Sequence, residues 1–191
     1  MVDKIRKKAT VKKDTKTGKP KKDKIDLSIV IPVYNEKESV KHLYSNLDGA
    51  LSKLKLRYEV ILIDDGSTDG TYDELKKIHG KSDFYKIIRF RRNFGQTSAM
   101  SAGFDHAIGD IIITLDADLQ NDPGDIPMIL AKMDEGYDIV SGWRKDRKDK
   151  AVSRRFPSII ANKIISKLTG VRLHDYGCTL KAYRKEVIEN I

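Results

Sequence analysis

Five short apolar runs alternate with segments of helical periodicity, and this alternation most restricts the folds open to the chain. The runs are residues 27–33, 59–63, 86–90, 111–115 and 138–140. Between them, apolar residues recur at helical spacing over about 36–55, and 71–79 and 96–108 are also predicted to be helices. Strands that are apolar almost throughout, separated by helices, are typical of a parallel sheet covered on both faces. We therefore predict a single α/β domain, Rossmann-like, with a mostly parallel central sheet and helices on both faces.

The net charge of +9 over 191 residues belongs almost entirely to the first 24. Residues 1–24 hold eleven Lys and Arg against three Asp, whereas the remaining residues hold twenty-six basic and twenty-five acidic groups. Such a polar segment cannot bury enough apolar surface to fold alone. Residues 1–25 are therefore predicted to be a disordered basic tail, and 26–191 the folded domain. The tail fits a solubilising arm, and attraction to an anionic membrane or to RNA stays open.

Several classes of protein are disfavoured by the composition. No apolar run approaches the roughly 20 residues of a membrane-spanning helix, and no secretory signal follows the basic N-terminus. The single Cys178 excludes an intramolecular disulfide framework and a multi-cysteine zinc site. A reducing, cytoplasmic compartment is expected, and the nearly neutral domain does not predict a nucleic-acid partner.

Polar clusters follow three of the predicted strands. PVYNE (32–36) follows the first strand, DDGS (64–67) the second and DADLQ (116–120) the fourth. Ligands of open α/β sheets bind at the carboxyl ends of the strands, near the point where the strand order reverses. The three clusters are therefore expected to meet in one crevice.

Asp116 and Asp118 are one residue apart at a strand end, where both carboxylates can face the same cleft. Two such carboxylates repel each other unless a cation lies between them. Mg²⁺ or Mn²⁺ prefers oxygen ligands, phosphate oxygens among them, and Gln120 could add a neutral oxygen. The alternative is an acidic loop start that caps a helix, since Pro123 and Asp125 follow.

Three further clusters each have a structural and a functional interpretation. Helix capping accounts for Ser67, Thr68 or Asp69, but the two consecutive carboxylates of 64–65 could also bind a nucleobase or a ribose. The basic run 144–155 is either a solvated charged loop or a phosphate-binding loop. Asp175 is either a turn residue before Gly177 or a carboxylate near a reacting centre.

Five motifs in order resemble the family 2 inverting glycosyltransferases with the GT-A fold. They are PVYNE, DDGSTDGT, NFGQTSAMSAGFDHAIGD, DADLQNDP and DYGCTLKAYR. They are most similar to the polyprenyl-phosphate branch, which includes dolichol-phosphate mannose synthases and bacterial undecaprenyl-phosphate sugar transferases. The resemblance covers about residues 27–191.

The resemblance implies a role for particular residues. Residues implied to bind the nucleotide sugar are Pro32, Tyr34, Glu36, Ile63, Asp65, Leu115, Asp116, Ala117, Asp118, Gln120 and Arg144. A divalent metal, Mg²⁺ or Mn²⁺, is implied at Asp116, Asp118 and Gln120. Arg154 and Arg155 are implied to bind the acceptor phosphate. Direct roles in the reaction are implied for Asp118, Arg144 and Asp175, although an anionic phosphate acceptor makes a base dispensable.

The function expected from the resemblance is transfer of a sugar from a GDP- or UDP-linked donor to dolichyl or undecaprenyl phosphate. Two alternatives stay open: a GT-A transferase with a saccharide acceptor, and a non-catalytic module that binds through its basic tail. A nucleotidyltransferase is disfavoured because PVYNE stands where a Gly-rich basic loop is usual. Since related chains continue beyond the DYGC segment, we expect a C-terminally truncated domain that binds the donor. We expect it at the cytoplasmic face of a membrane, in peripheral contact through segments such as 156–168 or anchored by segments absent here.

Overall fold

The computed structural model describes residues 2–5, 24–143 and 177–190. The strands are β1 (Val2–Ile5), β2 (Leu27–Val33), β3 (Tyr58–Asp64), β4 (Tyr85–Arg89), β5 (Ile111–Thr114), β6 (Ile139–Gly142) and β7 (Lys181–Arg184). The helices are α1 (Lys37–Leu51), α2 (Thr71–His79), α3 (Gln96–His106), α4 (Ile126–Asp134) and α6 (Lys185–Ile188), with a short 3₁₀ turn η1 (Pro123–Asp125). The five predicted strands and three predicted helices are confirmed, with ends shifted by a few residues.

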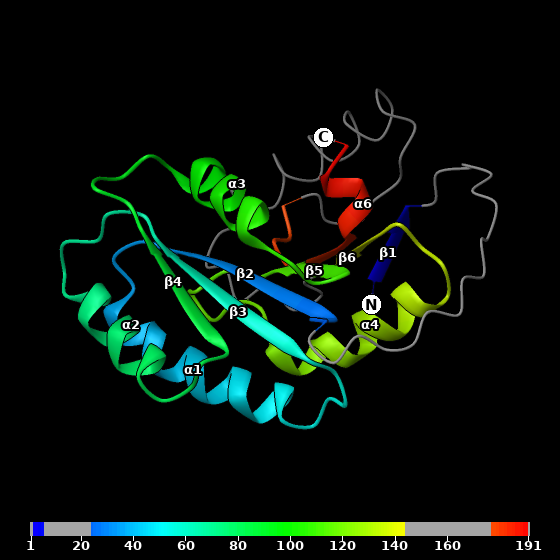
Figure 1. Cartoon of the computed structure of the whole chain (residues 1–191), viewed down its shortest axis with the longest axis horizontal. Helices are drawn as coiled ribbons and strands as arrows, with labels where there is room; N and C mark the ends of the chain where they lie inside the picture. Colours follow the sequence, from blue (N-terminus) through cyan, green and yellow to red (C-terminus); the bar gives the residue numbers. More distant parts are fainter. Residues whose placement is uncertain (1, 6–23, 144–176, 191) are drawn as a thin grey trace, which may run out of the picture.

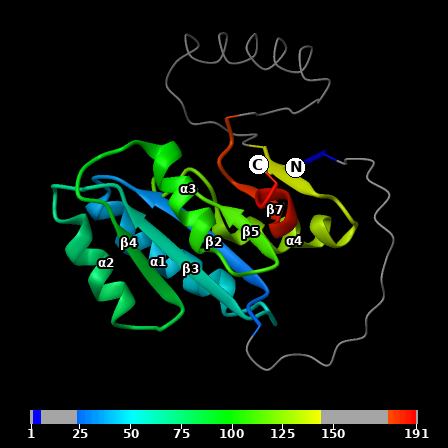
Figure 2. The same cartoon turned by 45° about the horizontal axis from the view of Figure 1, so that its top comes forward.

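The strands form one seven-stranded sheet in the order β1-β6-β7-β5-β2-β3-β4 (Figures 1 and 2). The pairs β2–β3, β3–β4 and β2–β5 are parallel, and β7 is antiparallel to both β5 and β6. Strands β2 to β6 therefore all run in one direction, which confirms the mostly parallel sheet. The chain passes from β2 through β3 to β4 on one side and then returns to β5 on the other side of β2. The strand order thus reverses between β2 and β5, where a ligand site is expected.

Helices cover both faces of the sheet. In Figure 1, α1, α2 and α4 lie below the strands and α3 and α6 lie above them. Alternate residues of β2 pack against the two helical layers. Ile29 and Ile31 lie in the core cluster beside α1, and Val30 lies in the core cluster beside α3. Such alternation follows from the two-residue period of a strand. The prediction of an α/β domain with two helical layers is therefore confirmed.

The positions of α1 and α3 against the sheet follow from their sequences. The predicted apolar stripe of α1 is buried at Val40, Leu43, Leu47 and Leu51, and each such side chain stabilises the fold by about 1.5–3 kcal/mol. Helix α3 approaches the sheet closely at Gly103, where an added Cβ would lie 2.2 Å from Val30 Cγ1. The small residues of α3 thus allow the close contact that the sequence indicated.

A buried carboxylate joins three segments at the amino end of the strands. Glu59, which is 2% exposed, accepts hydrogen bonds from the Ser28 hydroxyl (2.6 Å), Lys86 Nζ (2.6 Å) and the Ile108 N–H (2.9 Å). Burial alone would raise the pKa of Glu59, but hydrogen bonds from Lys86 and Ser28 outweigh it and lower that pKa. Glu59 therefore fixes the turn before β5 at the edge opposite the strand carboxyl ends.

Some elements were not expected from the sequence. Strand β1 lies within the predicted basic tail and pairs antiparallel with β6, whereas residues 6–23 lie outside the described residues. Strand β7, helices α4 and α6, and η1 were also not predicted. None of the helices in the described ranges is both long enough and apolar enough to cross a bilayer.

Candidate functional site

A cavity of about 310 Å³ opens at the carboxyl ends of β2, β3 and β5, where the strand order reverses. Its lining residues are Pro32, Val33, Tyr34, Glu36, Asp65, Asn93, Gly95, Gln96, Asp116, Ala117 and Asp118. All three predicted polar clusters contribute to it. The expectation that they meet in one crevice is confirmed.

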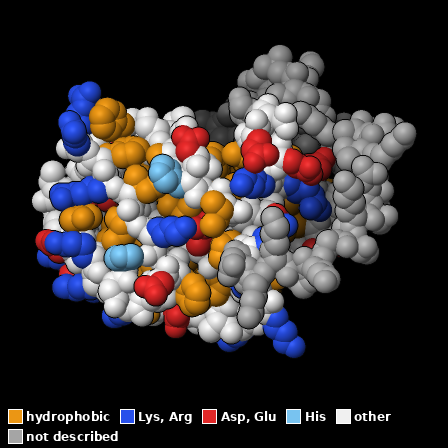
Figure 3. Space-filling view, in the orientation of Figure 1, with side chains coloured by type: hydrophobic (Ala, Val, Ile, Leu, Met, Phe, Trp, Pro, Cys, Tyr) orange, Lys and Arg blue, Asp and Glu red, His pale blue; other side chains and the backbone are white. Residues whose placement is uncertain are grey.

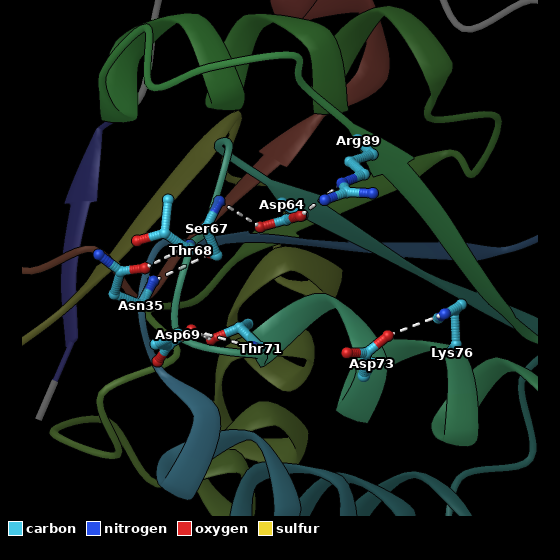
Figure 4. A network of polar contacts seen from close by, with 9 residues as sticks. All are labelled: Asn35, Asp64, Ser67, Thr68, Asp69, Thr71, Asp73, Lys76 and Arg89. Atoms are coloured by element: carbon cyan, nitrogen blue, oxygen red, sulfur yellow. Dashed lines mark hydrogen bonds and ion pairs between the residues drawn. The ribbon is translucent and has the colours of Figure 1, made fainter.

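Backbone and side-chain hydrogen bonds join the loop after β2 to the loop after β3 (Figure 4). The N–H of Asn35 donates to Ser67 Oγ at 3.0 Å, and Asn35 Oδ1 accepts from the N–H of Thr68 at 2.9 Å. Asn35 adopts a left-handed φ of 53°, which Asn tolerates better than most residues. The N–H of Glu36 donates to Thr71 Oγ1 at 2.9 Å. The wall that carries Tyr34 and Glu36 is therefore held in place by the start of α2.

Asp69 completes this connection between α1 and α2. Its carboxylate accepts from the hydroxyl (2.5 Å) and N–H (2.9 Å) of Thr71 and from the N–H of Lys37 (3.2 Å). Desolvation opposes ionisation, but these hydrogen bonds outweigh it and lower the pKa of Asp69. Asp69 thus satisfies N–H groups at the first turns of both helices, although the N-cap residue of α2 is Gly70 and not one of the predicted capping residues.

The consecutive carboxylates Asp64 and Asp65 have different roles. Asp64 is fully buried; it accepts from the N–H of Ser67 at 3.0 Å and forms an ion pair with Arg89 Nε at 3.4 Å (Figure 4). Asp65 is 3% exposed and accepts from the N–H groups of Phe94 (2.7 Å) and Gly95 (3.0 Å). Asp64 therefore stabilises its own turn, while Asp65 fixes the loop after β4 against the cavity.

Asp116 and Asp118 face the same cavity, as predicted. Asp116 Oδ1 accepts from Gln96 Nε2 at 2.9 Å, and Asp116 Oδ2 accepts from the Thr179 hydroxyl. Asp118 is exposed, and its Oδ1 accepts from the N–H of Gln120 at 3.0 Å. Two carboxylates with room for phosphate oxygens match the way proteins hold Mg²⁺, through one or two carboxylates plus substrate. In the described ranges, no cluster of three or more His, Cys, Asp or Glu residues surrounds a point, so a metal here would take its remaining ligands from elsewhere.

The other residues implied to bind a nucleotide sugar separate into three groups. Pro32, Tyr34, Glu36 and Ala117 line the cavity with the acidic residues. Ile63 and Leu115 are fully buried in the two core clusters, and neither they nor the exposed Gln120 is among the lining residues. The predictions for Arg144, Arg154, Arg155 and Asp175 lie outside the described residues.

Sequence reasoning assigned no role to several residues that the structure places at the site. Asn93, Gly95 and Gln96 line the cavity, and their position directly after β4, within the NFGQ motif, could have indicated this. Thr179 contacts Asp116 across 63 residues of sequence; it lies within the DYGCTLKAYR motif, but nothing in that motif indicates the contact with Asp116.

Two bacterial relatives cover most of the chain. A dodecaprenyl-phosphate galacturonate synthase of Rhizobium johnstonii is 46% identical over 169 residues, which are 87% of this chain and 50% of the relative. An undecaprenyl-phosphate 4-deoxy-4-formamido-L-arabinose transferase of Shewanella sediminis is 47% identical over 164 residues, 85% of this chain and 49% of the relative. The chain thus spans about half the length of these relatives.

A solved structure shares the GT-A fold. Glucosyl-3-phosphoglycerate synthase of Mycobacterium tuberculosis, solved with Mn²⁺, UDP and glucosyl-3-phosphoglycerate, superimposes with a TM-score of 0.61 at 20% identity. The match covers 85% of this chain and 58% of that protein. Residues 28–191 also match the model of glycosyl transferase family 2, and the chain therefore belongs to that family.

Proposed function

We propose that this domain belongs to an inverting glycosyltransferase that moves a sugar from a nucleotide-diphosphate sugar to a polyprenyl phosphate. The observation that carries the proposal is the cavity at the strand-order reversal, with Asp116 and Asp118 on its wall. Both bacterial relatives are named after a polyprenyl phosphate and a sugar, which supports a polyprenyl phosphate as the acceptor. The almost neutral domain supports a small-molecule donor over a nucleic acid, and in Figure 3 basic side chains are interspersed with acidic and apolar ones.

The donor would occupy this cavity. Tyr34, which is 47% exposed, offers a ring to the nucleoside, and Asp65 holds the loop after β4 that also lines the cavity. Gln96 begins α3 at the cavity edge, and no described side chain caps that helix. The N–H groups of its first turn would therefore attract the diphosphate. A divalent cation, Mg²⁺ or Mn²⁺, would be held by Asp116 and Asp118 and would neutralise charge on the departing nucleoside diphosphate.

The reaction is a single displacement that needs little proton transfer. An acceptor phosphate oxygen forms a bond to the anomeric carbon from the face opposite the leaving group, and the bond from that carbon to the diphosphate oxygen breaks. The configuration at the anomeric carbon is inverted and the nucleoside diphosphate leaves. Since the acceptor phosphate is already an anion, no side chain has to remove a proton. This fits a cavity in which Asp65 is hydrogen-bonded to the loop after β4 and Asp116 to Gln96 and Thr179.

A polyprenyl-phosphate acceptor also implies that the enzyme works at a membrane. A polyprenyl chain stays in the lipid phase while its phosphate reacts, so the mouth of the cavity would work at a membrane surface. We place that surface on the cytoplasmic side, where nucleotide sugars are made available. The predicted acceptor-phosphate residues Arg154 and Arg155 remain predictions.

A thermal-shift panel tests the donor site. UDP, GDP, UDP-glucose and GDP-mannose are each added with and without Mn²⁺, and one nucleotide is expected to stabilise the chain only with metal. A ligand at 100 times its Kd stabilises a fold by roughly 2.7 kcal/mol. Asp118→Ala should abolish this stabilisation while leaving the ligand-free Tm unchanged, because Asp118 is exposed.

The acceptor needs a separate assay. Transfer of labelled sugar to undecaprenyl phosphate in vesicles is expected, and preferential transfer to a free saccharide would favour the alternative acceptor class. The absence of any nucleotide-dependent stabilisation, with or without Mn²⁺, would refute the donor site.

A further inference from the structure

Asp116 is the end point of a chain of hydrogen bonds that reaches well behind the cavity. Its Oδ2 accepts from Thr179 Oγ1, and Thr179 Oγ1 in turn accepts from Asn121 Nδ2 at 3.1 Å. Asn121 Oδ1 accepts from the thiol of Cys178 at 3.6 Å. These four residues come from the end of β5, the loop before η1 and the segment leading into β7.

The direction of this chain follows from the donors available. A threonine hydroxyl has one proton, and Asn121 Nδ2 can only donate. Since the amide occupies an acceptor position of Thr179 Oγ1, the hydroxyl proton is directed toward the Asp116 carboxylate. Asn121 is 4% exposed and Cys178 is 1% exposed, so water cannot readily replace either partner.

A second donor holds the other oxygen of the same carboxylate. Gln96 Nε2 donates to Asp116 Oδ1 at 2.9 Å from the first turn of α3. Both oxygens of Asp116 are therefore oriented by neutral donors from separate segments. By contrast, Asp118 receives its described hydrogen bond from the N–H of Gln120, two residues further along its own loop.

We infer that Thr179 is a positioning residue that sets the orientation of the Asp116 carboxylate toward the donor diphosphate and its metal, with Asn121 fixing the direction of the Thr179 hydroxyl. This inference rests on the proposed function for the identity of the ligand. Thr179 is not among the cavity-lining residues, so it acts through Asp116. Groups that hold a metal-binding carboxylate from behind typically change metal affinity by roughly 10- to 100-fold when removed.

The test measures Mn²⁺ binding, by the loss of its free electron-spin-resonance signal, in the presence of the nucleotide that stabilises the wild-type chain. Thr179→Val keeps the side-chain shape and removes the hydroxyl. It is expected to raise the Kd for Mn²⁺ by roughly tenfold or more. Thr179→Ser retains the hydroxyl and should bind Mn²⁺ within about threefold of wild type. Thr68→Val is the matched control, because Thr68 is exposed and its described hydrogen bond uses the backbone N–H, which the substitution keeps.

Two further variants keep the test decisive if Thr179→Val does not fold. Asn121→Ala leaves the hydroxyl in place without its orienting donor and should weaken Mn²⁺ binding, and in combination with Thr179→Val it should add little. Gln96→Met removes the exposed donor from the opposite side and should also weaken binding.

The outcomes separate the two proposals. Wild-type binding of Mn²⁺ and nucleotide, with unchanged Kd in Thr179→Val and Asn121→Ala, would overturn the positioning role alone. A lower Tm with unchanged Mn²⁺ affinity would also overturn it, by showing a purely structural contact. Failure of the wild-type chain to bind any nucleotide and Mn²⁺ would overturn the proposed function together with this inference.

Discussion

Gly66 offers a direct test of how the turn after β3 supports the cavity. It has a left-handed φ of 70°, and its α-carbon faces the backbone of the loop after β4. A Cβ added there would lie 2.3 Å from the carbonyl carbon of Arg92, 2.6 Å from Arg92 Cα and 2.7 Å from the N of Asn93. All three contacts are with backbone atoms, so rotation of a side chain cannot relieve them.

The cost of Gly66→Ala has two parts. The left-handed conformation costs an alanine about 1–2 kcal/mol, and overpacking against a fixed neighbour adds about 1–3 kcal/mol. The sum is about 2–5 kcal/mol, which for a chain of this size lowers Tm by at least roughly 4 °C. The displaced loop includes Phe94 and Gly95, whose N–H groups bind Asp65, so nucleotide binding should weaken as well.

Substitutions at two other glycines separate the conformational cost from the overpacking cost. Gly136 follows α4 with a φ of 91° and nothing within 4 Å of an added Cβ, so Gly136→Ala should lose only the conformational part and leave nucleotide binding intact. Gly49 lies within α1 with equally open space, and Gly49→Ala should stabilise the chain by up to about 1 kcal/mol. Denaturant unfolding of all three variants gives the free energies. A Gly66→Ala variant that is no less stable than Gly136→Ala and binds nucleotide normally would refute the reasoning.

Two further substitutions test the buried carboxylates at opposite ends of the sheet. Asp65→Asn should destabilise the chain by about 1–3 kcal/mol in thermal unfolding, because an amide has one acceptor for two N–H donors; Asp118→Asn, at an exposed position, is the control and should not. The pKa of Glu59 in the folded chain is lowered below its ordinary value of 4.5. Ionised Glu59 therefore stabilises the fold above pH 4.5, and this stabilisation is lost as the pH falls through the lowered pKa. The difference in unfolding free energy between wild type and Glu59→Gln should therefore shrink between pH 6 and pH 3, and a constant difference would contradict the assignment.

The sequence predicted the parts of this structure that depend on local periodicity. The runs 27–33 and 111–115 are apolar because both faces of these strands are covered, and that pattern is visible without a structure. Strand β7 (KAYR) has no such run. It pairs with β5 and β6 only after the chain has returned to the sheet, so its assignment depends on contacts distant in sequence.

The candidate site also has some features that the local sequence predicts and others that depend on contacts distant in sequence. The acidic pairs could be predicted because polar residues directly after buried strands face a common edge. The hydrogen bonds from Gln96 and Thr179 to Asp116 could not, because each joins segments at least 20 residues apart. Ile63 packs in the core cluster that contains Ala99 of α3, as its position in a two-sided strand requires, and its place beside the nucleotide stays a prediction.

Asp64, Asp65, Asp116 and Asp118 lie at strand ends, and their hydrogen bonds indicate which of these carboxylates is available to a ligand. Asp64 binds its own turn and Arg89, and Asp65 binds two N–H groups of the next loop. Asp116 is oriented by side chains from two other segments, so its position depends on the folded core. Asp118 is exposed and lies on a short loop where Leu119 adopts a left-handed φ of 63°. A ligand that draws Asp118 toward Asp116 would therefore have to shift this loop, whereas Asp116 is already held by Gln96 and Thr179. Metal binding should accordingly change the environment of Leu119 much more than that of Thr179.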